Sequence, residues 1–306
     1  MKNPLGIHAL VWTGSWERKD IDFAISSSSK LGFDIIEIPL LNPYNFNAEY
    51  TKKVLDINQI KGVTSLGLSE KTDISSEDPV IRENGAKLLA KALEMTYQIG
   101  SKYMGGVLYS ALKKYHAPPT KNAFQNSAEI IRDLCNKAKK MEIIIGLEPV
   151  NRYESNLINT ASEALEYIEL TECNNLCVHL DSYHMNIEES SYRKSIIQCG
   201  RKLGYFHVGE NHRGYLGSGN IDFTEIFTTM KDIGYLGPIT FESFSSSVVE
   251  PQLSNTLAVW RNLWDDSNDL AENAKSYMDN LMTVSYTHLR AHETEADLVC
   301  RLLLEK

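Results

Sequence analysis

Residues 143–148 (IIIGLE), 177–181 (CVHLD), 205–208 (YFHV) and 239–242 (ITFE) are short apolar runs with an acidic or imidazole side chain at or beside the carboxyl end. These side chains are Glu148, Asp181, His207 and Glu242. Short runs of apolar and β-branched residues are typical of buried β-strands. The pattern therefore predicts a site built on the ends of several strands.

Runs of this kind begin near residues 6, 34, 62, 102, 143, 177, 205 and 239, which places them 28 to 41 residues apart. The segments between them have helical periodicity. Residues 17–31 keep their apolar side chains on one face, and Gly32 follows as a residue that takes the left-handed conformation easily. Asp78-Pro79 marks another helix start, and Thr160–Glu163 and Asp222–Glu225 have the spacing of a capping box. Eight strand-then-helix units predict an α/β fold, a single (β/α)8 TIM barrel over residues 1–284, a length that suits a fold of typically ~250 residues.

Composition narrows the class of protein. The net charge is −9, from 31 basic and 40 acidic residues, and no long basic stripe is present, so we expect no nucleic-acid partner. The apolar runs are too short for a membrane span and the amino terminus resembles no secretory signal, so we expect no membrane association and a cytoplasmic location. Five cysteines without a CxxC pair favour buried thiols over disulfides or a zinc knuckle.

Residues 285–306 do not continue the preceding pattern and resemble a translated adapter or vector segment. We therefore predict that they are a non-native tail. His288 and His292 in this tail have the spacing of a zinc-binding helix, but the glutamate of the HExxH motif is missing between them.

The carboxyl ends of the strands of such a barrel meet at one mouth, and this face carries the active site. Three carboxylates there would repel one another unless a cation lies between them. Glu148, Asp181, His207 and Glu242 are therefore predicted to bind a metal. An oxygen-rich set with one histidine suits Mn²⁺, Mg²⁺ or Co²⁺ better than a thiolate-dependent zinc site.

Three further residues follow closely in the chain and are predicted to contact a small polyhydroxylated ligand at the same mouth. Glu154 follows Glu148, His184 follows Asp181, and Arg213 follows His207. Together they supply a carboxylate, an imidazole and a guanidinium, which suit the hydroxyls and carbonyl of a sugar.

The segments 146–154 (GLEPVNRYE), 179–189 (HLDSYHMNIEE), 206–222 (FHVGENHRGYLGSGNID) and 239–244 (ITFESF) resemble the ketose 3-epimerase family, which includes D-tagatose, D-allulose and L-ribulose 3-epimerases. The likeness runs from about residue 6 to residue 282 and places the chain among xylose-isomerase-like TIM barrels. The resemblance implies that a divalent ion, usually Mn²⁺, is held by the four predicted ligands. It also implies that Glu154, His184 and Arg213 bind the O1 to O3 end of the sugar. The loop after His207 and residues 245–264 look most like the L-ribulose 3-epimerase branch.

The residue types also suggest how such an enzyme would work. A metal that binds O2 and O3 of a ketose acidifies the C3 proton, and inversion at C3 requires bases on both faces of the sugar. Glu148 and Glu242 are the predicted pair of catalytic acid/bases.

Four more residues are predicted to contact the rest of the sugar: His8, Trp12, Gly106 and Leu112. His8 stands where allulose-type relatives commonly have an aromatic residue, and Leu112 stands where they commonly have tryptophan. Trp12 is retained. His8 is either a ligand contact or a core histidine, and the choice between a ketopentose and a ketohexose stays open.

Three other functions are compatible with the same barrel. A 1,2-aldose–ketose or hydroxypyruvate-type isomerase would use the same metal and acid–base chemistry. An endonuclease IV-like enzyme needs more histidines and more positive charge than this chain offers. A non-catalytic sugar-binding protein is disfavoured because residues of the required types stand at all four metal-ligand positions and at both positions of the proposed bases. For the oligomeric state, the family resemblance predicts a homodimer or homotetramer.

Overall fold

The computed structural model describes residues 3–283, and the predicted tail with His288, His292 and Cys300 lies outside them. Eight parallel strands pair in sequence order and close into a barrel. The strands are β1 (Leu5–His8), β2 (Ile35–Pro39), β3 (Lys61–Ser65), β4 (Tyr103–Gly105), β5 (Ile144–Leu147), β6 (Leu176–Asp181), β7 (Leu203–Val208) and β8 (Ile239–Phe241). The predicted (β/α)8 barrel is confirmed.

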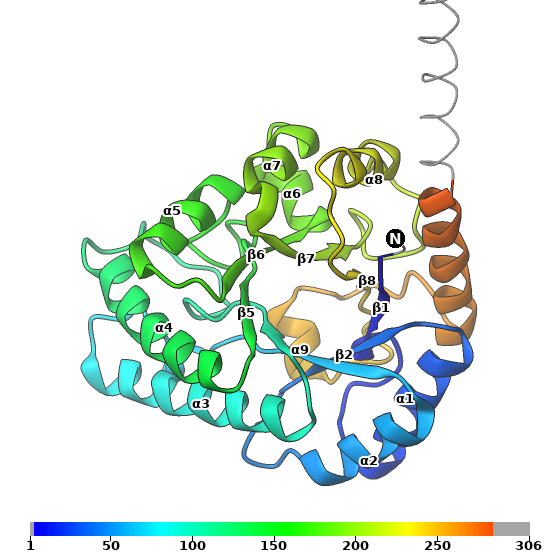
Figure 1. The fold of residues 1–306 in the computed structure, drawn as a ribbon, viewed down its shortest axis with the longest axis horizontal. Coiled ribbons are helices and arrows are strands. Elements are labelled where there is room, and N and C mark those ends of the chain that lie inside the picture. The colour runs from blue at the N-terminus through cyan, green and yellow to red at the C-terminus, as the bar shows by residue number, and fades with distance from the viewer. Residues whose placement is uncertain (1–2, 284–306) are drawn as a thin grey trace, which may run out of the picture.

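Helices surround the strands (Figure 1). They are α1 (Arg18–Lys30), α2 (Ala48–Asn58), α3 (Pro79–Gln98), α4 (Ala123–Lys140), α5 (Ala161–Thr171), α6 (Ser182–Glu188), α7 (Tyr192–Cys199) and α8 (Phe223–Asp232), with short 3₁₀ turns at Ala9–Val11, Glu70–Thr72 and Gly200–Lys202. A further helical segment covers residues 267–283. The short helix α9 (Pro251–Thr256) instead lies inside the ring of outer helices (Figure 1).

Local sequence explains where the helices start and stop. Asp78 accepts a hydrogen bond from Val80 N at the start of α3, with Pro79 at the first helical position. The capping box at Thr160 is present in full, whereas at Asp222 the side chain accepts from Glu225 N. Gly32 has φ +77°, as expected for a residue that follows a helix end.

The core consists of a small cluster of Leu10, Phe244 and Val249 and of two main parts. The larger part lies between the outer faces of the strands and the helices. The smaller part fills the interior of the barrel as an apolar plug made of Ile35, Val63, Tyr103, Cys177 and Tyr205. Inward-facing side chains form layers in such a barrel. The inward-facing residues that follow the plug residues along each strand therefore lie nearer to the mouth.

The first apolar run shows one difference between pattern and structure. Residues 6–12 read as a continuous run, but β1 ends at His8 and a 3₁₀ turn follows over Ala9–Val11. The His8 side chain accepts a hydrogen bond from Leu10 N and so caps this turn. Trp12 is therefore directed toward α1, where its ring lies 6.0 Å from that of Phe23.

Two composition-based expectations concern the described residues. The cysteines at 135, 173, 177 and 199 are buried free thiols, as predicted. Between residues 3 and 283 there is no helix with the length and apolar character needed to cross a lipid bilayer.

Candidate active site

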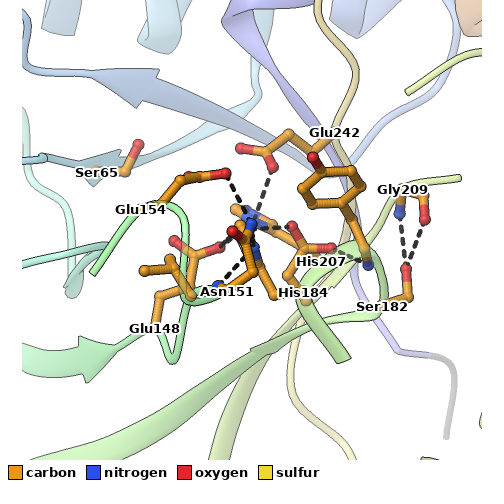
Figure 2. Close-up of polar contacts among 12 residues, drawn as sticks. Ser65, Glu148, Asn151, Glu154, Ser182, His184, His207, Gly209 and Glu242 are labelled. Atoms are coloured by element: carbon orange, nitrogen blue, oxygen red, sulfur yellow. Dashed lines mark hydrogen bonds and ion pairs between the residues drawn. The ribbon is translucent and has the colours of Figure 1, made fainter. Parts of the chain in front are cut away.

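The four predicted metal ligands converge at the mouth of the barrel. Figure 2 shows Glu148, His207 and Glu242 of this set. Each offers one ligand atom, and these atoms all lie within 4.8 Å of one another. Asp181 ends β6, His207 lies near the end of β7, and Glu148 and Glu242 directly follow β5 and β8. In the register of the barrel Asp181 is paired with His207. Side chains distant in sequence therefore form one buried cluster because their strands are neighbours.

The two carboxylate oxygens of Asp181 have different surroundings. Its Oδ1 accepts a hydrogen bond of 2.8 Å from Tyr183 N and caps α6. Its Oδ2 is buried without a hydrogen-bond partner, 3.0 Å from Arg213 Nη2 and 3.6 Å from His184 Nε2. One oxygen thus anchors a helix, and the other is directed into the site.

Glu148 and Glu242 have opposite electrostatic environments. Burial raises the pKa of Glu148 to about 8, and the nearby Glu242 and Asp181 add to this against the pull of His207. Burial also acts to raise the pKa of Glu242, but His207, Arg213 and His8 together outweigh it and hold that pKa below its usual range. Glu148 Oε1 lies 3.3 Å from His207 Nδ1, whereas Glu242 Oε2 lies 2.8 Å from Arg213 Nη1. The two glutamates therefore differ in protonation in the absence of a cation.

Arg213 lies across this acidic cluster and contacts Asp181 and Glu242 through different guanidinium nitrogens. The guanidinium carbon is 3.9 Å from the centre of the Tyr183 ring, a cation–π contact. The residue has φ +61°, in the left-handed region that side chains other than glycine seldom adopt. The loop after β7 is thus held in a costly conformation that places this charge in the site.

The donor set fits a divalent cation. Three carboxylates share this space with a single arginine nearby, and burial raises the pKa of Asp181 to about 6 as well as that of Glu148. Raised carboxyl pKa values mean that the anionic forms lack enough positive charge around them. Carboxylate oxygens with one imidazole nitrogen suit a hard or borderline ion such as Mn²⁺ or Mg²⁺.

A cavity of about 190 Å³ opens beside this cluster. Its polar lining includes all the predicted ligands except Asp181, together with Glu154, His184 and Arg213. Its apolar lining is formed by Leu10, Leu40, Leu66, Val107, Leu112 and Phe244, with Leu253 and Leu257 contributed by α9 and the residue that caps it. A small ligand that combines chelating oxygens with carbon atoms in van der Waals contact fits such a lining.

Two of the predicted sugar-binding residues, Glu154 and His184, are held by a common neighbour, Asn151. Its side-chain amide donates to Glu154 Oε1 at 2.9 Å, and its backbone N–H donates to His184 Nδ1 at 3.2 Å. Because Nδ1 accepts, the His184 hydrogen lies on Nε2, which is directed toward Asp181 and Glu148. Burial lowers the pKa of His184, so the ring is neutral.

The other predicted contacts divide into two groups. His8, Gly106 and Leu112 line the cavity, and Gly106 has φ +110° where its backbone approaches Leu66 closely. Trp12 does not line it, because the turn after β1 directs that ring toward α1. The role of Trp12 as a substrate contact stays a prediction.

Sequence reasoning missed two buried polar side chains beside the cluster. Glu37 in β2 lies 2.8 Å from His207 Nε2, and the ring of His179 in β6 makes a T-shaped contact with that of His207, with centroids 4.1 Å apart. The described residues offer a second possible metal-ligating group, made of Glu148, His179 and His207. The available signal was one polar residue in the interior of each apolar run, Glu37 in DIIEIPL and His179 in CVHLD.

Comparisons with known proteins agree with this architecture. Residues 25–274 match the family model of the xylose isomerase-like TIM barrel. The chain is 47% identical to the L-ribulose 3-epimerase of Methylomonas sp. (strain DH-1) over 273 residues, which cover 89% of this chain and 96% of that protein. It is 42% identical to the ketose 3-epimerase of Arthrobacter globiformis over 283 residues, or 92% of this chain and 98% of that one.

A solved structure of a D-allulose 3-epimerase from Methylomonas sp., in complex with D-allulose, superposes with a TM-score of 0.90 at 46% identity. The superposition covers 91% of this chain and 97% of that one. The likeness extends over almost the whole barrel, including the strand ends that carry the acidic cluster. This chain therefore belongs to the ketose 3-epimerase family of xylose-isomerase-like TIM barrels.

Proposed function

We propose that this protein is an isomerase that inverts the configuration of a ketose at C3. The observation that carries the proposal is the convergence of Glu148, Asp181, His207 and Glu242 within 4.8 Å at the barrel mouth, beside a cavity lined by polar and apolar side chains. The named relatives act on L-ribulose and on ketoses, which supports a ketopentose or a ketohexose as substrate.

Glu148, Asp181, His207 and Glu242 would hold a divalent ion, with Mn²⁺ the proposed choice and Mg²⁺ or Co²⁺ the alternatives. When bound, the ion would polarise the C2 carbonyl and so acidify the proton on C3. Glu154, His184 and Arg213 would bind the hydroxyls at the same end of the sugar.

Glu148 and Glu242 would carry the proton transfer at C3. They come from β5 and β8, which are not neighbours in the barrel, so their carboxylates approach the cavity from different directions. One carboxylate would take the C3 proton and leave an enediolate, and the other would return a proton to the opposite face. The apolar wall that includes α9 would exclude water while the enediolate exists.

The test replaces each proposed base in turn. Glu148→Gln and Glu242→Gln should each abolish epimerisation of ketopentoses and ketohexoses assayed with Mn²⁺, with both epimers separated by chromatography. In deuterated solvent each variant should exchange the C3 hydrogen of one epimer at most, because one face has lost its base. Glu166→Gln, an exposed change on α5, is the control for the loss of a carboxylate.

Full epimerase activity in either variant would contradict the two-base assignment. An aldose formed from the ketose by the parental protein would instead favour isomerisation between C1 and C2. Sugar binding without any turnover in the presence of Mn²⁺ would favour a non-catalytic sugar-binding protein.

Two further proposals concern the cellular location and the oligomeric state of the enzyme. We propose that it works in the cytoplasm, where reducing conditions suit its buried free thiols. We also propose that it forms a homodimer or homotetramer, which light scattering on protein ending at residue 284 would test.

A further inference from the structure

The two ring nitrogens of His207 have different surroundings. Nδ1 is directed into the acidic cluster, 3.3 Å from Glu148 Oε1 and 3.6 Å from Glu242 Oε2. Nε2 lies on the far side of the ring, 2.8 Å from Glu37 Oε2. A neutral imidazole carries its hydrogen on one nitrogen and its lone pair on the other, so the partner of Nε2 decides which nitrogen is free to bind a cation.

Glu37 depends on this contact. Its side chain is fully buried in β2, on the inward face that also carries Ile35 of the apolar plug. A buried carboxylate is costly unless it is paired and hydrogen-bonded. Its Oε2 has His207 as its partner, whereas Oε1 has no hydrogen-bond partner and lies 3.7 Å from His8 Nε2. The contact with His207 therefore provides the main stabilisation of this buried charge.

Glu37 does not belong to the ligand cluster itself. In the part of the chain that the structure describes, the groups whose ligand atoms approach within 4.8 Å of one another include His207 but not Glu37. Glu37 lies on the Nε2 side of the His207 ring, opposite the nitrogen that is directed into the cluster. Carboxylates in this position orient metal-binding imidazoles.

We propose that Glu37 is the positioning residue of His207: it accepts the Nε2 hydrogen, keeps the lone pair on Nδ1, and holds the ring toward the cation. The inference rests on the proposed metal site and adds a residue that acts through one of its ligands. It predicts that Glu37 controls metal affinity before any sugar is bound.

The experiment measures Mn²⁺ binding by calorimetry, without sugar, in the parental protein and in Glu37→Gln and Glu37→Leu. Glu37→Leu should bind Mn²⁺ about 10- to 100-fold more weakly, the range found when an outer partner of a metal-bound histidine is removed. Glu37→Gln should lose less affinity, because its amide oxygen still accepts from Nε2 although the charge is gone.

A second measurement reads the ring directly. Nitrogen NMR of Mg²⁺-loaded protein should show the His207 hydrogen on Nε2 in the parental protein and in Glu37→Gln. Glu37→Leu should show a mixture of both tautomers. A residue that only stabilised the fold would not change this signature.

Thr64→Val is the matched control. Thr64 is fully buried in the neighbouring strand β3, and its hydroxyl lies 2.7 Å from that of Thr96. The change removes a buried polar contact without touching His207, so it should leave Mn²⁺ affinity and the tautomer unchanged. Circular dichroism melting in EDTA checks that each variant is folded, and if Glu37→Leu does not fold, Glu37→Gln carries the affinity test alone.

Parental affinity in both Glu37 variants, or an equal loss in Thr64→Val, would overturn this inference and leave the metal site standing. Failure of the parental protein to bind Mn²⁺ or Mg²⁺ would overturn the proposed function together with it. The two failures are therefore distinguishable.

Discussion

At the scale of single residues, the sequence predicted the groups that end strands and missed those within them. Glu148, Asp181, His207 and Glu242 were found because each stands where an apolar run stops, and the barrel brings all of them within 4.8 Å. Glu37 stands in the middle of a run, 170 residues before its partner His207. A contact over that separation depends on the closure of the barrel, which no local pattern encodes.

Arg213 gives a prediction at this scale because it contacts two carboxylates at once. Arg213→Lys should lower kcat/KM at least tenfold, since a single ammonium lacks the guanidinium fork that reaches both Asp181 and Glu242. Steady-state kinetics on the preferred ketose measures the loss. Arg193→Lys, at the half-exposed ion pair with Asp232, is the matched control and should leave kcat/KM unchanged. Equal kinetics in the parental protein and Arg213→Lys would show that one contact is enough.

At the scale of elements, hydrophobic periodicity and caps located the strands and most helix starts. Strands and helices alternate as the sequence predicts. Helix α3 starts at Asp78-Pro79, and α5 starts with the capping box of Thr160 and Glu163. The pattern was misleading at residues 6–12, because a 3₁₀ turn after His8 breaks an apolar run that reads as one strand. Because of this turn, His8 lines the cavity and Trp12 does not.

The cap of α3 gives a prediction about stability. Asp78→Ala should lower the free energy of unfolding by about 1 kcal/mol, the usual cost of losing an N-cap side chain. Urea unfolding followed by circular dichroism measures it, and kcat should not change because Asp78 is remote from the cavity lining. Lys87→Ala on the same helix removes only an exposed ion pair with Glu83 and should cost less than Asp78→Ala. A smaller effect of Asp78→Ala than of Lys87→Ala would contradict the capping role.

At the scale of the whole molecule, a buried acidic cluster opposes folding unless a cation balances it. Metal that binds only the native protein stabilises it by about 2.7 kcal/mol when its free concentration is 100 times Kd. Mn²⁺ should therefore raise the melting temperature of the protein, and excess EDTA should reverse the gain. Absence of any gain would contradict the metal site.

The same stabilisation should depend on pH. Burial raises the pKa of Glu148 from 4.5 to about 8, so between these pH values the native metal-free protein holds a proton that the unfolded chain has released. The metal-free protein should therefore lose stability as pH rises from 6 to 8. A cation must displace this proton, so the gain from Mn²⁺ should be larger at pH 8 than at pH 6. Melting curves at both pH values, with and without Mn²⁺, measure the trend, and a gain that shrinks with pH would contradict it.

The apolar plug of Ile35, Val63, Tyr103, Cys177 and Tyr205 closes the barrel beneath the polar residues. The cavity lies above it, at the mouth, so reactant and product must occupy the same space in turn. A newly formed epimer that has not yet departed therefore blocks the next molecule. Accumulated product should for this reason slow the forward reaction as a competitive inhibitor, and a higher concentration of starting sugar should restore the rate.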